Sequence, residues 1–166
     1  MSNDTSNTEI IAKSPTSEWL TFRLDKLDYA VNILRVKEIR AWEDATRVPF
    51  SPHFVSGLIN LRGAIVPVVN LRLRFHLESL PPSAETVILV MDIHDEGITK
   101  TVGMVVDAIS EVVETSSDNS QLDPDFDLAI PRDFISGIAD IGTSMLVLLN
   151  VDRVLDLEMP AFSQDS

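Results

Sequence analysis

Hydrophobic residues occur along the chain in short segments that are rich in Val, Ile and Leu. Gly, Pro, Asp and Asn separate these segments at intervals that are typical of β-proteins. The pattern predicts ten strands, which are Trp19–Leu24, Asp28–Asn32, Val36–Ala41, Gly57–Leu61, Ala64–Asn70, Thr86–Ile93, Lys100–Val106, Ser110–Glu114, Ile135–Ile141 and Ser144–Val151. The predicted helical segments are short: Pro52–Val55 as a turn, Leu71–Phe75, and a last helix from Asp152 into the Glu158 region. The sequence therefore predicts an all-β fold with a few short helices.

An internal repeat relates two parts of the chain. The segment His53–Phe75 aligns without gaps on Asp133–Leu155, at an offset of 80 residues. Its identical pairs are Phe54/Phe134, Ser56/Ser136, Gly57/Gly137 and Asn70/Asn150. Apolar positions also match along the alignment, so the two copies are predicted to form the same strand unit. We expect its core residues to be Leu58, Leu61, Val66 and Val68 in one copy and Ile138, Ile141, Leu146 and Leu148 in the other.

A second stretch extends the repeat upstream at a different offset. The residues from Tyr29 align on those from Val102, which brings Glu38 onto Glu111 at an offset of 73. The change of offset predicts a longer surface loop in the second copy, at about Ser116–Pro131. Closing each unit into a barrel would protect its strand edges, so we expect two small β-barrels with a binding groove between them. A duplication with nothing functional between its copies remains the alternative.

Composition narrows the function classes. The 166 residues are 45% hydrophobic, which is enough for a sizeable core. Thirteen Lys and Arg against 26 Asp and Glu give a net charge of -13, which disfavours nucleic acid and anionic lipid as partners. There is no cysteine, so disulfides, thiol nucleophiles and cysteine zinc sites are excluded. The N-terminus lacks the features of a signal peptide and the apolar segments are far shorter than a membrane span, so we expect a soluble cytoplasmic protein without membrane insertion.

The segment from Gly57 to Arg72 carries the residues that go beyond core packing. Gly63 is expected to take a positive backbone angle and close a tight hairpin. Arg62 is either a solvated turn residue or a planar cation that pairs with a carboxylate or a partner carbonyl. Pro67 cannot donate to a strand ladder, which predicts an edge strand or a bulge there. Glu38 lies outside this segment, and the alternation of charged and apolar residues around it predicts a position on a solvated strand face.

No residue is assigned to catalysis, to a metal or to a cofactor. The chain contains no nucleophile elbow, phosphate loop or dinucleotide fingerprint. Its only carboxylate and imidazole cluster contains Asp92, His94, Asp95 and Glu96. Ligands that are adjacent in sequence rarely converge on one metal ion, so this cluster is predicted to be a polar hairpin between strands.

Four segments in this order and spacing resemble the CheW family. They are YAVNILRVKEIR from Tyr29, GLINLRGAIVPVVNLR from Gly57, VGMVVDAISEV from Val102 and MLVLLNVDRVL from Met145. The resemblance runs from about Glu18 to Leu157. One departure is that Asn70 and Asn150 stand where many relatives have Asp at the first position.

The resemblance implies two intimately packed five-stranded SH3-like β-barrels. Residues 1–16 would be a flexible leader, 17–157 the CheW-like domain and 158–166 a C-terminal tail. Within the domain, the first barrel would span about 26–84, and the second about 85–157 together with the N-terminal strand at 17–25.

The resemblance also implies a function and its partners. Such proteins are non-enzymatic scaffolds that couple the cytoplasmic tips of methyl-accepting chemoreceptors to the regulatory domain of the CheA histidine kinase. They would be recruited to receptor arrays at the inner face of the membrane. The receptor-binding residues carried over to this chain lie at the groove between the lobes, and they are Val36, Glu38, Gly57, Leu58, Arg62 and Val87. Kinase contacts are expected on exposed apolar ends of both barrels.

Two other hypotheses remain beside the coupling scaffold. The first is another regulator with a CheW domain, such as a CheV-like protein without its receiver, for which a receiver would need about 120 further residues. The second is a metal-dependent hydrolase of β-barrel type, which a bound metal and a nucleophile cluster would reveal.

Overall fold

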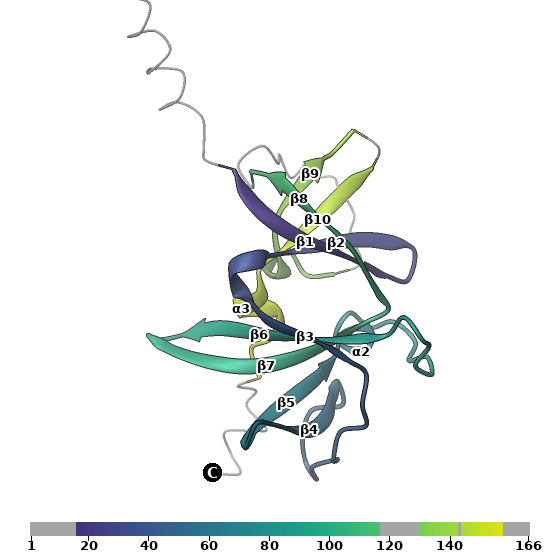
Figure 1. The fold of residues 1–166 in the computed structure, drawn as a ribbon, viewed down its shortest axis with the longest axis vertical. Helices are drawn as coiled ribbons and strands as arrows, with labels where there is room; N and C mark the ends of the chain where they lie inside the picture. The colour runs from purple at the N-terminus through teal and green to yellow at the C-terminus, as the bar shows by residue number, and fades with distance from the viewer. Residues whose placement is uncertain (1–15, 117–129, 143, 158–166) are drawn as a thin grey trace, which may run out of the picture.

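The computed structural model describes residues 16–116, 130–142 and 144–157, which form two five-stranded sheets packed together (Figure 1). The strands are β1 (Ser17–Leu24), β2 (Leu27–Asn32), β3 (Val36–Ala41), β4 (Val55–Leu61), β5 (Ala64–Asn70), β6 (Val87–Asp95), β7 (Ile98–Val106), β8 (Ala108–Thr115), β9 (Ile135–Asp140) and β10 (Met145–Leu149). The short helices are η1 (Ile33–Arg35), α2 (Leu71–Arg74), η3 (Arg132–Phe134) and α3 (Val151–Val154). The predicted all-β class with short helices is confirmed.

The order of the strands confirms the internal repeat. We call the sheet with the order β8-β1-β2-β10-β9 sheet A and the sheet with the order β3-β6-β7-β5-β4 sheet B. Repeat-related strands occupy equivalent places in the two sheets. One edge strand is β8 in sheet A and β3 in sheet B, and the other edge strand is β9 in sheet A and β4 in sheet B. The strand next to this second edge is β10 in sheet A and β5 in sheet B. In both sheets this inner strand pairs in parallel, β10 with β2 and β5 with β7.

The strands are divided between the sheets differently from the predicted ranges 26–84 and 85–157. Strand β2 joins β1 in sheet A, whereas β6 and β7 join β3, β4 and β5 in sheet B. The chain crosses between the sheets twice, through η1 between β2 and β3 and at Asp107 between β7 and β8. Each hairpin pairs with strands that are distant in sequence. The alignment of the two repeat copies does not determine which distant strands pair. The closure of each sheet into a barrel stays a prediction.

Among the described residues, three hydrophobic clusters hold the sheets. The largest lies between them and includes Phe22, Leu24, Leu71, Leu89 and Met91, all fully or almost fully buried. Smaller clusters lie on the other face of each sheet, around Val66, Val68 and Val90 in sheet B and around Trp19, Leu146 and Leu148 in sheet A. Alternate residues of β6 contribute to two clusters, because both faces of this strand are covered.

Strand alternation corrects part of the predicted core. Leu61, Val66, Val68, Ile138, Leu146 and Leu148 are buried as expected. Leu58 and Ile141 are only partly buried. In β4 the residues that point inward are Val55, Gly57, Ile59 and Leu61, so Leu58 belongs to the opposite face.

Local geometry agrees with several turn predictions. Arg62 and Gly63 both have positive φ, 52° and 87°, and close the predicted tight hairpin between β4 and β5. Strand β5 is not an edge strand, but its pairing with β7 begins only at Val68, so Pro67 is not required to donate to that ladder. The last helix is Val151–Val154, earlier than predicted.

Some predictions fall outside the described residues. They concern the leader within 1–15, most of the loop at Ser116–Pro131, and the tail from 158. Within the part of the chain that the structure describes, no helix has the length and apolar character of a membrane span.

Candidate binding surface

An ion pair joins the two edges of sheet B. The Arg62 guanidinium donates a hydrogen bond of 2.7 Å to the carboxylate of Glu38. Glu38 lies on edge strand β3, while Arg62 lies in the turn that follows the opposite edge strand β4. Sheet B is therefore curved enough to bring these two elements together. Arg62 is therefore the pairing cation of the two alternatives, and Glu38 is more than a solvated strand residue.

A second arginine holds the same carboxylate. Arg40 is two residues further along β3 and donates to Glu38 at 3.2 Å and to Glu43 at 2.8 Å. The pKa of Glu38 is lowered, first by the hydrogen bond from Arg62 and also by the one from Arg40. The side chain of Glu38 is 19% exposed and that of Arg62 is 72% exposed. Glu38 is thus the fixed member of the pair, and Arg62 is the member that a partner can reach.

Gly57 has a structural role in β4. Its φ is 147°, and a Cβ atom there would lie 2.2 Å from the carbonyl oxygen of Thr46. Thr46 and Leu58 exchange two backbone hydrogen bonds of 2.8 Å, so the backbone of 42–54 approaches β4 closely at this point. Glycine is required by this approach, whatever else Gly57 contacts.

Val36 and Val87 border the core between the sheets. Both are partly buried and pack against the largest hydrophobic cluster. Val87 lies opposite Ala41 in the pairing of β6 with β3, and Val36 lies opposite Met91. All six predicted receptor-binding residues therefore come from sheet B, and two of them approach sheet A.

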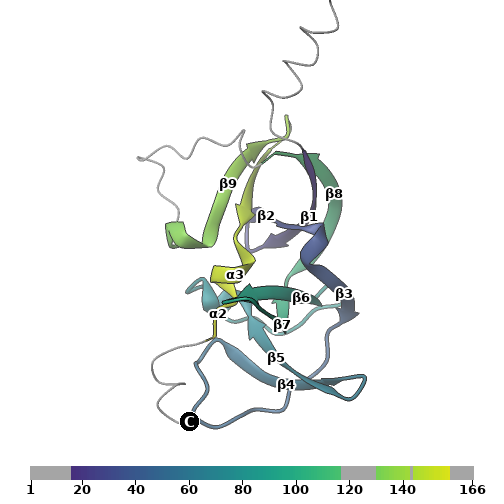
Figure 2. The same cartoon turned by 90° about the vertical axis from the view of Figure 1, so that its left-hand side faces the viewer.

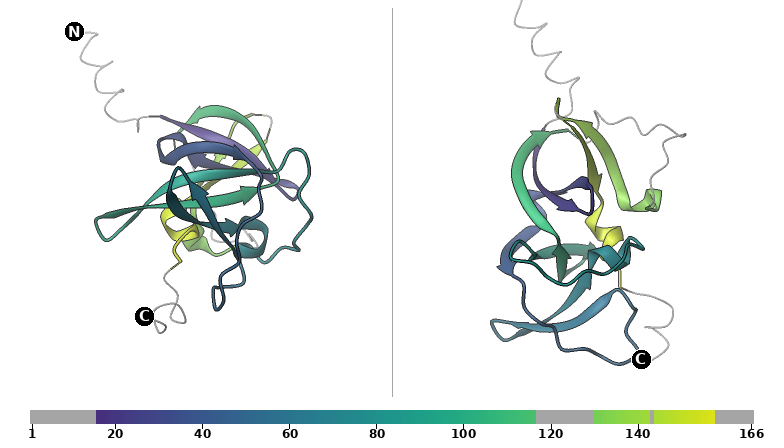
Figure 3. Two further views of the ribbon diagram at one scale, coloured as in Figure 1. Left: turned by 60° about the horizontal axis from the view of Figure 1, so that its bottom comes forward. Right: turned by 90° about the vertical axis from the view of Figure 1, so that its right-hand side faces the viewer.

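Sequence reasoning missed exposed apolar residues on the edge strands β3 and β8. Figures 2 and 3 show these two strands along the same side of the molecule. Ile39 on β3 and Val112 on β8 are exposed, and they are repeat-related at the offset of 73. The same offset had already related Glu38 to Glu111, so the signal was present in the alignment. Arg40 was also missed, although it shares a strand face with Glu38.

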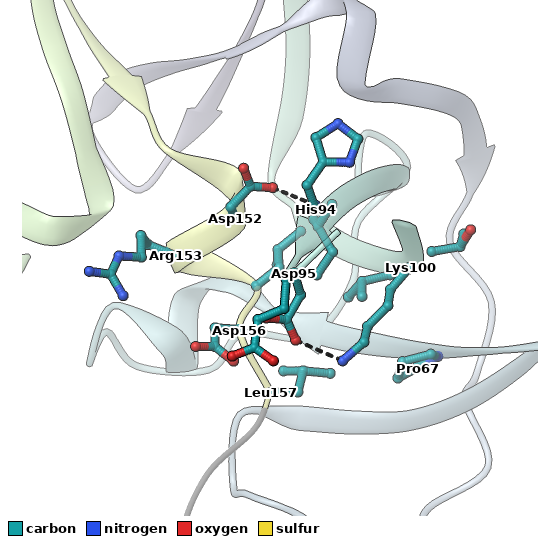
Figure 4. A pocket seen from close by; sticks show the side chains of 13 residues that line it. Pro67, His94, Asp95, Lys100, Asp152, Arg153, Asp156 and Leu157 are labelled. Atoms are coloured by element: carbon teal, nitrogen blue, oxygen red, sulfur yellow. Dashed lines mark hydrogen bonds and ion pairs between the residues drawn. The ribbon is translucent and has the colours of Figure 1, made fainter. Parts of the chain in front are cut away.

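A pocket of about 410 Å³ lies elsewhere, between the β6–β7 hairpin and α3 (Figure 4). Asp95 and Lys100 form an ion pair of 2.9 Å in its wall, and Asp152 accepts a hydrogen bond of 2.8 Å from the backbone of His94. None of the six predicted receptor-binding residues lines it. The segment from Asp92 to Glu96 is the predicted polar hairpin, with its turn at Glu96 and Gly97. Among the described residues, no group of three or more His, Asp or Glu is placed to hold a metal ion.

Comparison with known proteins agrees with the fold and the motifs. The family profile of the CheW-like domain matches residues 18–159. The chain is 32% identical over 141 residues to a chemotaxis protein CheW of Klebsiella aerogenes, covering 85% of this chain and 82% of that protein. It is 35% identical over 141 residues to that of Rhizobium meliloti, covering 85% and 88%.

A solved structure has the same architecture. The crystal structure of the scaffolding protein TtCheW from Thermoanaerobacter tengcongensis superposes with a TM-score of 0.75 at 28% identity, covering 87% of this chain and 95% of that one. The fold, the motifs and these matches define a two-sheet adaptor domain. The chain belongs to the CheW-like domain family.

Proposed function

We propose that this chain couples methyl-accepting chemoreceptors to the regulatory domain of the CheA histidine kinase. Family membership makes it a non-enzymatic scaffold or adaptor of chemotaxis. The observation that carries the finer proposal is the Glu38–Arg62 pair, because it joins residues that lie 24 positions apart at the expected receptor surface.

The proposed receptor surface is built on sheet B around that pair. Val36, Glu38 and Val87 belong to the adjacent strands β3 and β6, and Arg62 reaches them from the β4–β5 turn. Because Arg40 also neutralises Glu38, Arg62 can turn to a carboxylate or carbonyl of the receptor without leaving Glu38 unpaired. Gly57 and Leu58 contribute the shape of β4, and Leu58 adds a partly buried apolar side chain.

We place the kinase contacts at the exposed apolar ends of the two sheets. Ile65 at the start of β5 is 62% exposed, and Met145 at the start of β10 is 52% exposed. These two residues are repeat-related at the offset of 80. Exposed apolar residues next to hairpin turns suit protein contacts, and two such ends would let one scaffold contact two neighbours.

The proposed scaffold holds the receptor and the kinase in a fixed relative position and raises their effective concentration, and it catalyses no reaction itself. In the cytoplasm, binding to receptor tips would recruit it to arrays at the inner face of the membrane. Added to kinase without receptors, it should therefore change kinase activity little.

The deciding experiment measures binding to a receptor signalling fragment and to the CheA regulatory domain separately, and then kinase activity with all three components. Coupling requires binding to both partners and receptor control of the kinase only in the complete mixture. Binding to neither partner, or full kinase control without receptor, contradicts the proposal.

A matched pair of variants locates the receptor surface. Arg62→Glu should weaken receptor binding, whereas Arg23→Glu should not. Arg23 is a suitable control because it is a similarly exposed arginine, 62% against 72%, that also pairs with a carboxylate but belongs to sheet A.

A further inference from the structure

The side chain of Arg74 joins the two repeat units. Arg74 is the last residue of α2, and its guanidinium carbon lies 4.4 Å from the ring centre of Phe54 and 4.8 Å from that of Phe134. Phe54 directly precedes β4 of sheet B, and Phe134 directly precedes β9 of sheet A. A cation over an aromatic ring is attracted to it, and more strongly where water is excluded. One guanidinium therefore contacts an aromatic residue of each unit.

The same guanidinium caps the last turn of α3. Nε of Arg74 donates a hydrogen bond of 2.7 Å to the carbonyl of Val154, and Nη2 donates one of 3.3 Å to the carbonyl of Arg153. The last carbonyls of a helix have no partner within the helix, so donors from elsewhere stabilise them. Burial lowers the pKa of Arg74 and Asp156 raises it, and the guanidinium stays charged at neutral pH. Helix α2, which follows β5 of sheet B, is thus tied to α3, which follows β10 of sheet A.

The two phenylalanines hold equivalent places in the repeat, at the offset of 80. The carbonyl of Phe54 accepts a hydrogen bond of 2.7 Å from the backbone of Asn70, which directly precedes α2. The carbonyl of Phe134 accepts one of 2.8 Å from the backbone of Asn150, which directly precedes α3. Each phenylalanine is therefore fixed to the helix of its own unit, and a side chain that contacts both rings also positions the two helices.

Only one of the two units supplies the cation. At the offset of 80, Arg74 corresponds to Val154, which is fully buried. Because Arg74 already reaches the carbonyl of Val154, a second arginine there would bring like charges together. A single cation from α2 and an apolar residue from α3 are compatible with one shared contact.

The contacts of Arg74 lie at the sheet edges that the chain crossings do not join. The crossings directly precede β3 and β8, which are edge strands of sheets B and A. Phe54 and Phe134 directly precede β4 and β9, the opposite edge strands. Figure 2 shows β3 and β8 on the right of the molecule, and β9 and α2 on the left. The apolar cluster between the sheets attracts without direction, whereas the hydrogen bonds of Arg74 have a defined geometry.

We propose that the contacts of Arg74 with Phe54, Phe134 and α3 form a latch that closes the sheets at the β4 and β9 edges and fixes their relative orientation. The two proposed kinase ends depend on that orientation, since Ile65 lies on β5 beside β4 and Met145 lies on β10 beside β9. This consequence rests on the proposed function, whereas the latch does not. Arg74 is a positioning residue, because it acts on the partner contacts through the sheets that it joins.

Distances between paired spin labels test the latch, because the chain has no cysteine of its own. The first pair, His53→Cys with Asp133→Cys, uses exposed residues that directly precede the two phenylalanines. The second pair, Lys37→Cys with Ser110→Cys, uses exposed residues of β3 and β8 at the crossing edges. In Arg74→Leu, double electron–electron resonance should give a longer and broader 53–133 distance distribution. The 37–110 distribution should stay as it is with Arg74 present.

Arg23→Leu is the control for loss of charge. Arg23 forms its ion pair with Asp28 within one hairpin of sheet A, so its removal should change neither distribution. A folded Arg74→Leu protein with an unchanged 53–133 distribution overturns the proposal. Arg74→Lys covers the case in which Arg74→Leu does not fold. Its single ammonium cannot donate to both carbonyls while lying over both rings, so the distribution should shift part of the way, and an unchanged one would then overturn the latch.

Partner measurements test the positioning role separately. Arg74→Leu should keep the affinity for a receptor signalling fragment and for the kinase regulatory domain, each tested alone. It should lose several-fold of the receptor control of the kinase in the complete mixture, because the two ends are no longer held in one relative position. Full control by a protein whose latch has opened overturns the positioning role. A wild-type protein that binds neither partner contradicts the proposed function instead, and the label distances still decide on the latch.

Discussion

Arg62 in the β4–β5 turn and Glu38 on β3 form a 2.7 Å hydrogen-bonded ion pair, with Arg40 as a second donor to the same carboxylate. Because Arg62 is largely exposed and Glu38 is not, the pair has a fixed member and an accessible one. A partner that binds here meets a positioned guanidinium, and folding depends little on an exposed contact of this kind.

Charge reversal should therefore affect binding more than folding. Arg62→Glu or Glu38→Arg should weaken receptor association by about ten-fold or more, because each variant places like charges together at the surface. The kinase contact at the Met145 end, in sheet A, should be spared, and the double reversal should recover part of the receptor loss if the mutual pairing matters. The measurements are receptor and kinase affinities together with thermal unfolding. Equal damage to thermal stability and to both partners would make these residues structural.

Substitution of Gly57 should act mainly on folding stability. Gly57→Ala should destabilise the fold more than Gly63→Ala, because a Cβ at 57 meets the Thr46 carbonyl oxygen whereas a Cβ at 63 meets nothing within 4 Å. Gly63 has a positive φ, so its substitution should cost about 1 kcal/mol. Urea unfolding of both variants provides the comparison. A loss of receptor binding in a Gly57→Ala protein of unchanged stability would contradict this structural role.

Truncation of core residues tests the repeat-related packing. Leu148→Ala should lower the free energy of unfolding by about 2–5 kcal/mol, because Leu148 is fully buried in the sheet A cluster. Leu34→Ala is the control, since Leu34 is 84% exposed. Denaturant unfolding should separate the two variants clearly. Similar losses in both would mean that the sheet A cluster contributes little to stability.

The repeat could be predicted from the sequence because apolar spacing is a local property. The alignment of His53–Phe75 on Asp133–Leu155 anticipates that β4–β5 and β9–β10 occupy the same places in the two sheets. The assignment of β2, β6 and β7 to a sheet was not accessible in the same way. Strand pairing is decided by contacts between distant segments, and each hairpin has an apolar face that suits either sheet.

Only some contacts of the candidate side chains could be predicted from the sequence. The family motif placed Glu38 and Arg62 at one surface, and the structure brings them together. The Arg35–Asp152 pair joins residues 117 positions apart, and no sequence pattern marks two charges at that separation as partners. Leu58 was expected inside because every apolar residue of its segment was treated as core, whereas strand alternation turns it to the other face.

The pH dependence of stability tests the Asp152 contact. The hydrogen bond from Arg35 lowers the pKa of Asp152 below its ordinary value of 3.8. A carboxyl whose pKa is lower in the folded than in the unfolded state binds its proton more weakly when folded. Its stabilising contribution is therefore complete well above the ordinary pKa, and it is lost as the pH falls through the folded value.

Stability should accordingly decline from about pH 5 downwards, and Asp152→Asn should remove part of that decline. Near neutral pH the same variant should be less stable than wild type, because Arg35 loses its charged partner. The control is Glu78→Gln, which removes a charge at an exposed position. Urea midpoints measured from pH 7 to pH 3 compare the three proteins. An Asp152→Asn curve parallel to wild type over this whole range would show that the contact does not contribute to folding.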